Sequence, residues 1–538
     1  MFISRVDRNF SIEKLLTDKA LYFGSQKAII YYNVDTGERD ALTYEQLLKI
    51  VKKTALYLIS LGVKENDKIA MLMENTVEIL IFELAAAFVG AAVIPLDLKR
   101  DTLDRKTYKL RQTNSSVLFV KLSDKQDQQE EINALKQMIP DLKVVGWKRY
   151  SDLEILLKPF SEKASSATFG NKNLEHVYII LYTSGTTSHP KGVILNARSC
   201  LLNAQGIALW QQFTSHDRFG VILPLHHINS TIFSLSLLLS GGTIILCSRY
   251  SRSKFWDIVK EFKITNTSIV PTILHDLLTD ESRTTTETTL KRVCIGSAPV
   301  LPDEAVRFYQ KFQVRVIQGY GQTETALRVA GVPVDLEEDK YLKLLRQNSV
   351  GKALKNNKLS IMDENNQPKK ASEEGEICIK GPVVAKGYLN DPITTANSFK
   401  GEWFHSGDLG KYEIIEGEEY YFVIGRIKEI IIKGGVNISP SVVEDWLLKN
   451  FVEIDQACVV GIADERMGEE IGAAIILKQD LTEEKKEQLK KNNFRTKKEP
   501  SARGPFGLRN AYRSFLYERI SQDLNWQNTE GGSQKTNQ

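Results

Sequence analysis

The sequence predicts an α/β protein with a large N-terminal domain, a small β-barrel-like subdomain and a small α+β C-terminal domain. Three observations support this prediction. The chain has 538 residues, and chains beyond about 300 residues divide into several domains. Helical and strand patterns alternate through the first four hundred residues, which is typical of βαβ units with parallel strands. From Gly351 to Gly425, short strands alternate with turn residues instead.

The first elements set the βαβ pattern. Apolar spacing predicts, in order, a helix, a strand, a helix and a strand at Tyr44–Leu61, Lys68–Met73, Thr76–Phe88 and Ala92–Pro95. Gly62 ends the first helix. The most apolar stretch carries Glu83, so it predicts a buried helix that runs into a strand rather than a membrane span.

The same alternation recurs further along the chain. Strands are predicted at Phe219–Leu223, Thr243–Cys247 and Ser268–Val270, with helices at Ser230–Leu239 and Lys254–Phe262. From Arg426 we expect a βαβ-like module with elements at Ile430–Ile432, Ser439–Asn450, Ala457–Ile462 and Gly472–Leu477. Beyond Leu481 the sequence is charged and loses its periodicity.

The composition excludes several classes of protein. Hydrophobic residues make up 42% and charged residues 26%, which is typical of a soluble globular protein. A net charge of +4 gives no indication of a nucleic-acid partner. The five cysteines are far apart, so we expect reduced thiols and no metal cluster. The N-terminus lacks the pattern of a secretory signal, and we expect a cytoplasmic protein with no stable membrane insertion.

A loop rich in hydroxyl groups and glycine follows the predicted strand Val177–Leu181. Residues 181–193 read LYTSGTTSHPKGV. Gly185 and Gly192 allow backbone N–H groups to converge on an anion, and Lys191 adds a charge that can follow a phosphate. The other residues of this loop that we expect to contact the anion are Thr183, Ser184, Thr186 and Thr187. The string is not a Walker P-loop, because the G-x-x-x-x-G-K-[ST] pattern is missing.

Four further strings accompany this loop. They read QGYGQTET at 318–325, WFHSGDLG at 403–410, GRIKE at 425–429 and KGGVNISP at 433–440. Together the five strings resemble the acyl-adenylate-forming superfamily, which includes acyl-CoA synthetases, luciferases and peptide-synthetase adenylation domains. The resemblance extends from the N-terminal region to about Gln479. Ser188 departs from the usual glycine of the family, and Ser406 replaces its threonine.

The resemblance implies roles for individual residues of the first four strings. Glu324 would contact Mg²⁺, a role that suits a hard oxygen ligand. Thr323 would contact the phosphate or adenylate, and Tyr320 would offer an aromatic face to adenine. Further nucleotide contacts are implied for Gln318, Gly319 and Gly321. Residues 296–300 read GSAPV and resemble the loop that edges adenine in the family, which implies contacts for Gly296, Ser297 and Ala298 as well. Asp408 would accept hydrogen bonds from the ribose, and Arg426 would contact ribose and phosphate.

The resemblance also implies where the acid and the thiol lie. His227, within LPLHHINS, would stand at the entrance of the acyl pocket. Lys428 would be the hinge of a mobile C-terminal domain. Gly434 and Gly435 would line the route of the pantetheine arm. We expect an N-terminal domain at 1–425, the start of a C-terminal lid domain at 426–485 and an aberrant tail at 486–538.

The implied activity is that of an acyl-CoA synthetase that uses ATP, Mg²⁺ and CoA. A carboxylic acid, expected to be a fatty or aryl acid, would form acyl-AMP and then a CoA thioester. The aliphatic run Ile232–Leu239 is a weak indication of an apolar acyl group. Two alternatives stay open. The acceptor could be the thiol of an acyl carrier protein, or the chain could be an inactive nucleotide-binding relative of the enzymes.

The C-terminal sequence departs from the family. The family ends in a Pro-x-Thr-x-x-Gly-Lys segment whose lysine serves adenylation, and no such string follows Gln479. Residues 520–530 read ISQDLNWQNTE. A permitted back-translation of this string, read one base out of frame, gives Phe-Pro-Lys-Thr-Ser-Thr-Gly-Lys-Ile-Gln-Arg. Our hypothesis is therefore a frameshift in the gene or its reading, and the alternative is a divergent natural tail.

Overall fold

The computed structural model describes residues 3–7, 10–123, 126–169, 174–183, 190–280, 287–298, 300–451, 453–464, 466–477, 495–496 and 514–516. The chain forms two compact units. The larger holds residues 1–373, 378–406 and 412–422, and the smaller holds residues 374–377, 407–411 and 423–538. The division passes through three strands, because the chain crosses between the units within each of them: β17 (Gly375–Lys380), β19 (Trp403–Ile415) and β20 (Glu418–Arg426).

The first sheet of the larger unit has six strands in the order β6-β5-β3-β4-β7-β8. All neighbours are parallel except β7 and β8, which are antiparallel. The strands are β3 (Lys68–Leu72), β4 (Ala92–Pro95), β5 (Val117–Lys121), β6 (Lys143–Trp147), β7 (Val177–Thr183) and β8 (Lys191–Asn196). The accompanying helices are α1 (Ile12–Phe23), α2 (Tyr44–Ser60), α3 (Val77–Val89), α4 (Leu103–Thr113), α5 (Gln126–Met138), α6 (Tyr150–Leu157) and α7 (Ser161–Ser166), with a 3₁₀ turn η1 (Lys158–Phe160).

Local sequence explains these elements. Thr43 and Gln46 form a capping box at the start of α2, which satisfies backbone N–H groups that would otherwise lack partners. Gly90 ends α3 with a φ of 83°, a conformation that suits glycine. All residues of α3 are buried, Glu83 included. The predicted buried helix and the following strand are therefore confirmed within one or two residues.

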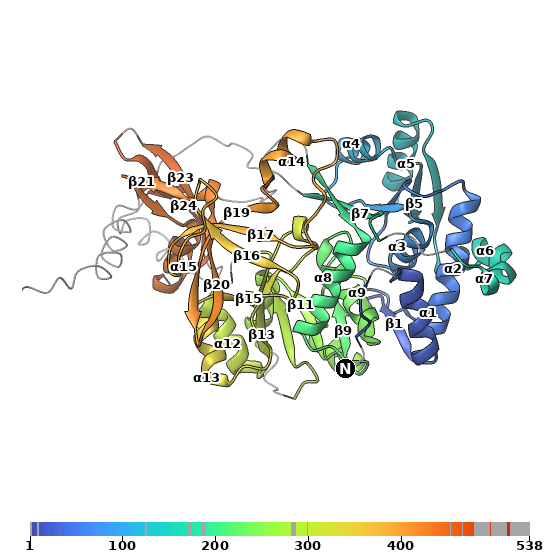
Figure 1. Cartoon of the computed structure of the whole chain (residues 1–538), viewed down its shortest axis with the longest axis horizontal. Coiled ribbons are helices and arrows are strands. Elements are labelled where there is room, and N and C mark those ends of the chain that lie inside the picture. Colours follow the sequence, from blue (N-terminus) through green and yellow to red (C-terminus); the bar gives the residue numbers. More distant parts are fainter. Residues whose placement is uncertain are drawn as a thin grey trace, which may run out of the picture. The chain divides into compact units, whose positions relative to one another are not determined.

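The second sheet begins with β1 (Lys27–Tyr32) and β2 (Arg39–Thr43) at one edge. Its parallel part runs through β10, β9, β11, β12 and β13. These strands are β9 (Arg218–Val221), β10 (Thr243–Cys247), β11 (Asn266–Ile269), β12 (Arg292–Ile295) and β13 (Arg315–Tyr320). Its helices are α8 (Ala197–Trp210), α9 (Ile228–Ser240), α10 (Phe255–Phe262), α11 (Pro271–Leu278), α12 (Pro302–Phe312) and α13 (Glu338–Arg346). Helices α12 and α13 lie beside β13 (Figure 1).

The sheet continues antiparallel from β13 into the region where the sequence changes character. The added strands are β14 (Ala330–Gly331), β15 (Ser349–Ala353), β16 (Lys358–Met362) and β18 (Phe399–Lys400), together with β17, β19 and β20. The 3₁₀ turn η2 (Thr323–Thr325) and helix α14 (Pro392–Ser398) lie in its connections. Antiparallel pairing in this region is as predicted from the alternation of short strands and turns.

The smaller unit contains one further sheet and helix α15 (Pro440–Asn450). Its strands are β21 (Ile431–Lys433), β22 (Val436–Ile438), β23 (Ile454–Asp464), β24 (Gly468–Leu477), β25 (Arg495–Thr496) and β26 (Ser514–Leu516), and a 3₁₀ turn η3 (Ile427–Glu429) precedes them. Strand β24 pairs antiparallel with β21, β23 and β26. The predicted strand–helix–strand order is present, but β23 and β24 form an antiparallel hairpin. Apart from β25 and β26, the predicted aberrant tail lies outside the described residues.

Candidate active site

Lys191 and Glu324 are brought together in the larger unit by one intervening segment. The backbone of Ala385–Leu389 bonds to β8 on one side, with Leu389 donating to the carbonyl of Gly192 at 2.8 Å. On the other side, the N–H of Ala385 donates to the carbonyl of Glu324 at 2.8 Å. Two residues that lie 133 positions apart (324 minus 191) therefore flank the same short stretch of chain.

Tyr388 links the two side chains. Its hydroxyl donates to Oε1 of Glu324 at 2.9 Å. The Nζ of Lys191 lies over its ring, 5.3 Å from the centroid, which is a cation–π distance. Burial, followed by the charge of Glu324, raises the pKa of Tyr388 above its usual value. Tyr388 is therefore a neutral hydrogen-bond donor that holds a carboxylate beside a lysine.

The expected phosphate loop is described only at its two ends. Thr183 ends β7 and pairs with Lys191 at the start of β8. Ser184, Gly185, Thr186 and Thr187 lie outside the described residues. Gly192 lies within β8, where an added Cβ would lie 3.3 Å from Cβ of Leu389. Its lack of a side chain thus serves the packing of β8 against the Tyr388 segment, rather than the anion-binding backbone conformation that we expected.

The turn that carries Glu324 follows β13 and has a constrained backbone. Gly321 has a φ of 156°, and an added Cβ would overlap the carbonyl of Leu327. Glu324 is 8% exposed, and Tyr320 is equally buried. Thr323 lies beside Glu324 in η2 and is partly exposed. The turn thus places one carboxylate and one hydroxyl at the end of a parallel strand, where ligands of open α/β sheets bind.

The expected adenine residues lie at the ends of β12 and β13. These strands are parallel neighbours, with Ile295 opposite Gln318, so Gly296 and Gly319 follow at the same edge. Ser297 has a φ of 75°, and Ser297 and Ala298 are both exposed. Gln318 is buried and donates to Oδ1 of Asn348 at 2.7 Å. Gly319 leaves room for Trp210, whose Cη2 would lie 2.9 Å from an added Cβ.

His227 is the residue that precedes α9, and its side chain is exposed. The adjacent His226 pairs with Asp97 at 3.2 Å. Desolvation by surrounding atoms, followed by repulsion from His226, lowers the pKa of His227 to about 4 although the residue keeps an open face. The imidazole is therefore neutral near pH 7. Helix α9 itself is entirely buried, so its aliphatic run is core and gives no indication of the acyl group.

The smaller unit holds the expected ribose residues. Asp408 is 4% exposed and accepts from Nε of Arg426 at 2.8 Å, while the Arg426 side chain is 50% exposed. The Arg426 side chain is therefore paired with Asp408 and at the same time partly open to solvent. Lys428 is exposed in η3. Gly434 and Gly435, with φ of 56° and 83°, form the two-residue turn between β21 and β22, which is the conformation that favours glycine in a hairpin.

Residues 17–389 match the family described as AMP-binding enzyme. The chain belongs to this family. It is 30% identical to the oxalate–CoA ligase of Arabidopsis thaliana over 82% of this chain and 84% of the relative. It is 28% identical to the long-chain-fatty-acid–CoA ligase FadD13 of Mycobacterium tuberculosis over 81% and 83% of the two chains. The crystal structure of ATP-bound MatB from Rhodopseudomonas palustris superimposes with a TM-score of 0.75 at 26% identity, covering 89% and 90%.

Two residues near Glu324 were missed in the sequence analysis. Tyr388 lies in the stretch KGYLNDP, about sixty residues beyond Glu324, and only its proline and glycine marked the stretch as a turn. Arg328 follows Glu324 by four residues and is 1% exposed. An arginine among apolar residues, within ALRVAGV, was the available signal. Buried charges are rare unless paired.

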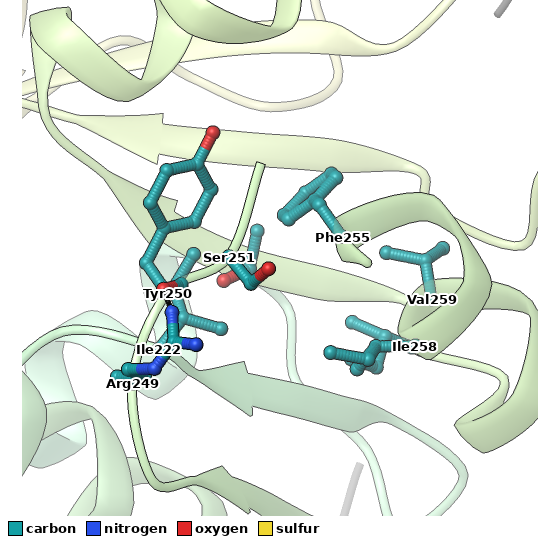
Figure 2. A pocket seen from close by; sticks show the side chains of 9 residues that line it. Ile222, Arg249, Tyr250, Ser251, Phe255, Ile258 and Val259 are labelled. Atoms are coloured by element: carbon teal, nitrogen blue, oxygen red, sulfur yellow. Dashed lines mark hydrogen bonds between the residues drawn. The ribbon is translucent and has the colours of Figure 1, made fainter. Parts of the chain in front are cut away.

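A small pocket elsewhere in the larger unit takes no part in this arrangement. In Figure 2, Phe255, Ile258 and Val259 of α10 face Ile222 and Tyr250. None of the residues expected to contact the nucleotide lines this pocket. We interpret it as a packing gap between α10 and the sheet. Among the described residues, no helix combines the length and apolar character that crossing a bilayer requires.

Proposed function

We propose that this protein activates a carboxylic acid with ATP to give acyl-AMP and pyrophosphate, and then transfers the acyl group to CoA. The observation that carries the proposal is the Lys191–Tyr388–Glu324 cluster in the larger unit. Membership of the AMP-binding enzyme family and the CoA-ligase names of two relatives support it. We also propose a cytoplasmic setting, supported by the dispersed cysteines.

The chemistry requires charge neutralisation and positioning more than acid–base groups. An oxygen of the acid attacks the α-phosphorus, and pyrophosphate leaves with the electrons of the broken P–O bond. The thiolate of CoA then attacks the acyl carbon, and AMP leaves. Lys191 would balance phosphate charge, while Asp408 and Arg426 would hold the ribose.

Glu324 and Thr323 fit a magnesium site. Mg²⁺ prefers hard oxygen ligands and takes one or two protein carboxylates together with water and phosphate oxygens. Glu324 offers a carboxylate whose orientation is fixed by the bond from Tyr388. When bound, the ion would neutralise charge on the phosphates. Tyr388 keeps the carboxylate near Lys191 without adding charge of its own.

The proposal also concerns which carboxylic acid is activated and which thiol accepts the acyl group. A fatty or aryl acid is our sequence-based hypothesis, and the names of relatives do not select between acids as different as oxalate and a long-chain fatty acid. CoA is the proposed acceptor, and a carrier-protein thiol is the alternative. Supplying each acceptor in turn to enzyme loaded with acyl-AMP separates the two.

The test compares the chain as it stands with a version in which the reading frame of the aberrant tail, residues 486–538, is restored. Exchange of labelled pyrophosphate into ATP, dependent on an added acid, measures adenylation. We expect the restored version to exchange and the present chain to do so very slowly, because it lacks the family's C-terminal lysine. Thioester formation from supplied acyl-AMP and CoA should differ much less between the two chains.

Two outcomes would contradict parts of this proposal. Equal exchange rates in both chains would show that the tail does not disable adenylation. ATP binding without exchange in the restored chain, across a broad panel of acids, would favour the inactive nucleotide-binding relative.

A further inference from the structure

Arg328 carries a positive charge in the interior of the larger unit, and no described residue forms an ion pair with it. The side chain is 1% exposed. Its Nε and Nη2 atoms are buried and have no hydrogen-bond partner among the described residues. Desolvation by burial lowers the pKa of the guanidinium to about 10, so it stays charged at neutral pH. A buried charge without a partner is strongly destabilising, so its presence calls for an explanation.

The neighbours of Arg328 do not neutralise it. Cys294 is the titratable group that interacts with it electrostatically. Burial raises the pKa of the Cys294 thiol to about 12, so this thiol is neutral. No carboxylate within the described part of the chain forms an ion pair with Arg328. The described residues therefore supply no acceptor for Nε and Nη2 of Arg328.

The backbone around Arg328 holds it firmly in this position. Asn203 donates through Nδ2 to the carbonyls of Thr325 at 3.1 Å and Arg328 at 2.7 Å. Leu327 has a φ of 117°, a conformation that costs about 1–3 kcal/mol for a residue with a side chain and that concentrates at functional sites. Strain of this kind persists where the surrounding bonds enforce it, as those of Asn203 do here.

Glycine makes room for the guanidinium. An added Cβ at Gly296 would lie 2.6 Å from Cζ of Arg328 and 2.5 Å from the carbonyl oxygen of Gly319. The guanidinium thus lies against the backbone where β12 and β13 end. The exposed residues Ser297 and Ala298 follow Gly296 directly in the chain. This is the edge of the sheet that also carries Glu324, four residues before Arg328 in the same turn.

We propose that Arg328 binds a second carboxylate of the acid that this enzyme activates. The inference rests on the proposed function and narrows its substrate from a plain fatty or aryl acid to one with two acid groups. A guanidinium binds a carboxylate through two parallel N–H···O bonds. The two free nitrogens of Arg328 match that requirement, and the substrate would supply the charge that the interior lacks.

A phosphate of the nucleotide is the other oxyanion that could reach this edge, so the experiment separates the two. Calorimetry on the full chain measures binding of ATP and of acids matched in length, namely hexanoate with adipate and 3-phenylpropionate with its ortho-carboxylated form. Arg328→Met removes the charge and keeps a similar volume. Arg328→Lys keeps the charge but lacks the two parallel N–H donors of the guanidinium. Arg292→Met is the matched control, because Nε of Arg292 already donates to Gln211 at 3.1 Å.

We expect at least one diacid to bind the parent chain about tenfold or more tighter than its monoacid, a factor in the range of hydrogen bonds to charged groups. Arg328→Met should abolish that preference, Arg328→Lys should retain part of it, and Arg292→Met should leave it intact. ATP affinity should change less than about twofold in Arg328→Met, since the proposed function assigns the phosphates to Lys191 and Glu324. The midpoint of thermal unfolding of ligand-free Arg328→Met should equal or exceed that of the parent, because an unpaired buried charge has been removed.

Three results would overturn the proposal. The first is a parent chain that binds diacids no better than the matched monoacids. The second is a fall in ATP affinity in Arg328→Met, which would assign the guanidinium to the nucleotide. The third is a lower unfolding midpoint of ligand-free Arg328→Met, which would make the arginine a structural residue. Failure of the parent chain to bind ATP would instead count against the proposed function.

Discussion

Glu83 gives the sharpest test of the interior electrostatics, because it is a carboxyl group in a wholly buried helix and no residue in the described ranges forms an ion pair with it. Desolvation raises its pKa from 4.5 to about 8, against a weaker opposing hydrogen bond with Thr231. Its Oε1 has no partner among the described residues. The native chain therefore keeps a proton between pH 4.5 and 8 that the unfolded chain has lost.

The sign and size of the effect follow from proton linkage. Because the folded pKa is raised, the stabilisation is complete below pH 4.5 and is lost as the pH rises toward 8. The free energy of unfolding should fall by ~1.4 kcal/mol per pH unit inside this window. From pH 5.5 to 7.5 the loss attributable to Glu83 is therefore about 3 kcal/mol.

Glu83→Gln removes this dependence while it keeps the shape of the side chain. Urea unfolding followed by intrinsic fluorescence at pH 5.5, 6.5 and 7.5 measures the free energy of unfolding of variant and parent. We expect the difference between them to grow in favour of the variant by ~1.4 kcal/mol per pH unit. Glu154→Gln, an exposed change on α6, is the control and should leave the slope unaltered.

Parallel pH profiles for Glu83→Gln and the parent would refute the reasoning. They would mean that Glu83 is ionised in the native state, and hence that an unrecognised partner or water stabilises its charge. Other groups that titrate in this range contribute equally to both proteins, so they cancel in the difference.

Three further predictions concern the site. Tyr388→Phe should weaken Mg²⁺-dependent ATP binding about tenfold, since it removes a hydrogen bond to a charged carboxylate. Tyr388→Leu should weaken ATP binding further, because Lys191 loses its contact with the ring as well. Equal ATP affinities of parent and variants, measured by calorimetry, would contradict this. Asp408→Asn should also weaken ATP binding measured by calorimetry. It should change the urea midpoint little, because an ion pair with the half-exposed Arg426 contributes little to stability. A large loss of stability with unchanged ATP affinity would show that the pair is structural. Gly296→Ala should lower the free energy of unfolding by about 1–3 kcal/mol through overlap with the guanidinium and the neighbouring carbonyl, and adding Arg328→Met should recover part of it.

Short-range patterns were sufficient for most individual elements. The apolar periodicity of Tyr44–Leu61 predicted α2, and Glu83 within an apolar stretch predicted a buried helix. Both predictions succeeded because the order of apolar and polar residues along a short stretch indicates the type of element and its burial. The turn at Gly434–Gly435 was not predicted, although its cause is equally local, since φ is positive at both residues. The antiparallel hairpin of β23 and β24 was not predicted, because strand direction depends on partners rather than on the strand's own sequence.

The sequence by itself therefore determined the elements, the family and the identities of the polar residues that gather in its motifs. Only the tertiary structure decided which of these polar residues contact one another. Tyr388 joins Lys191 to Glu324 because a distant segment bonds to both β8 and the turn after β13. The isolation of Arg328 likewise depends on what surrounds it in three dimensions. The physical reason is that desolvation and pairing are set by neighbours in space, which chain order does not specify.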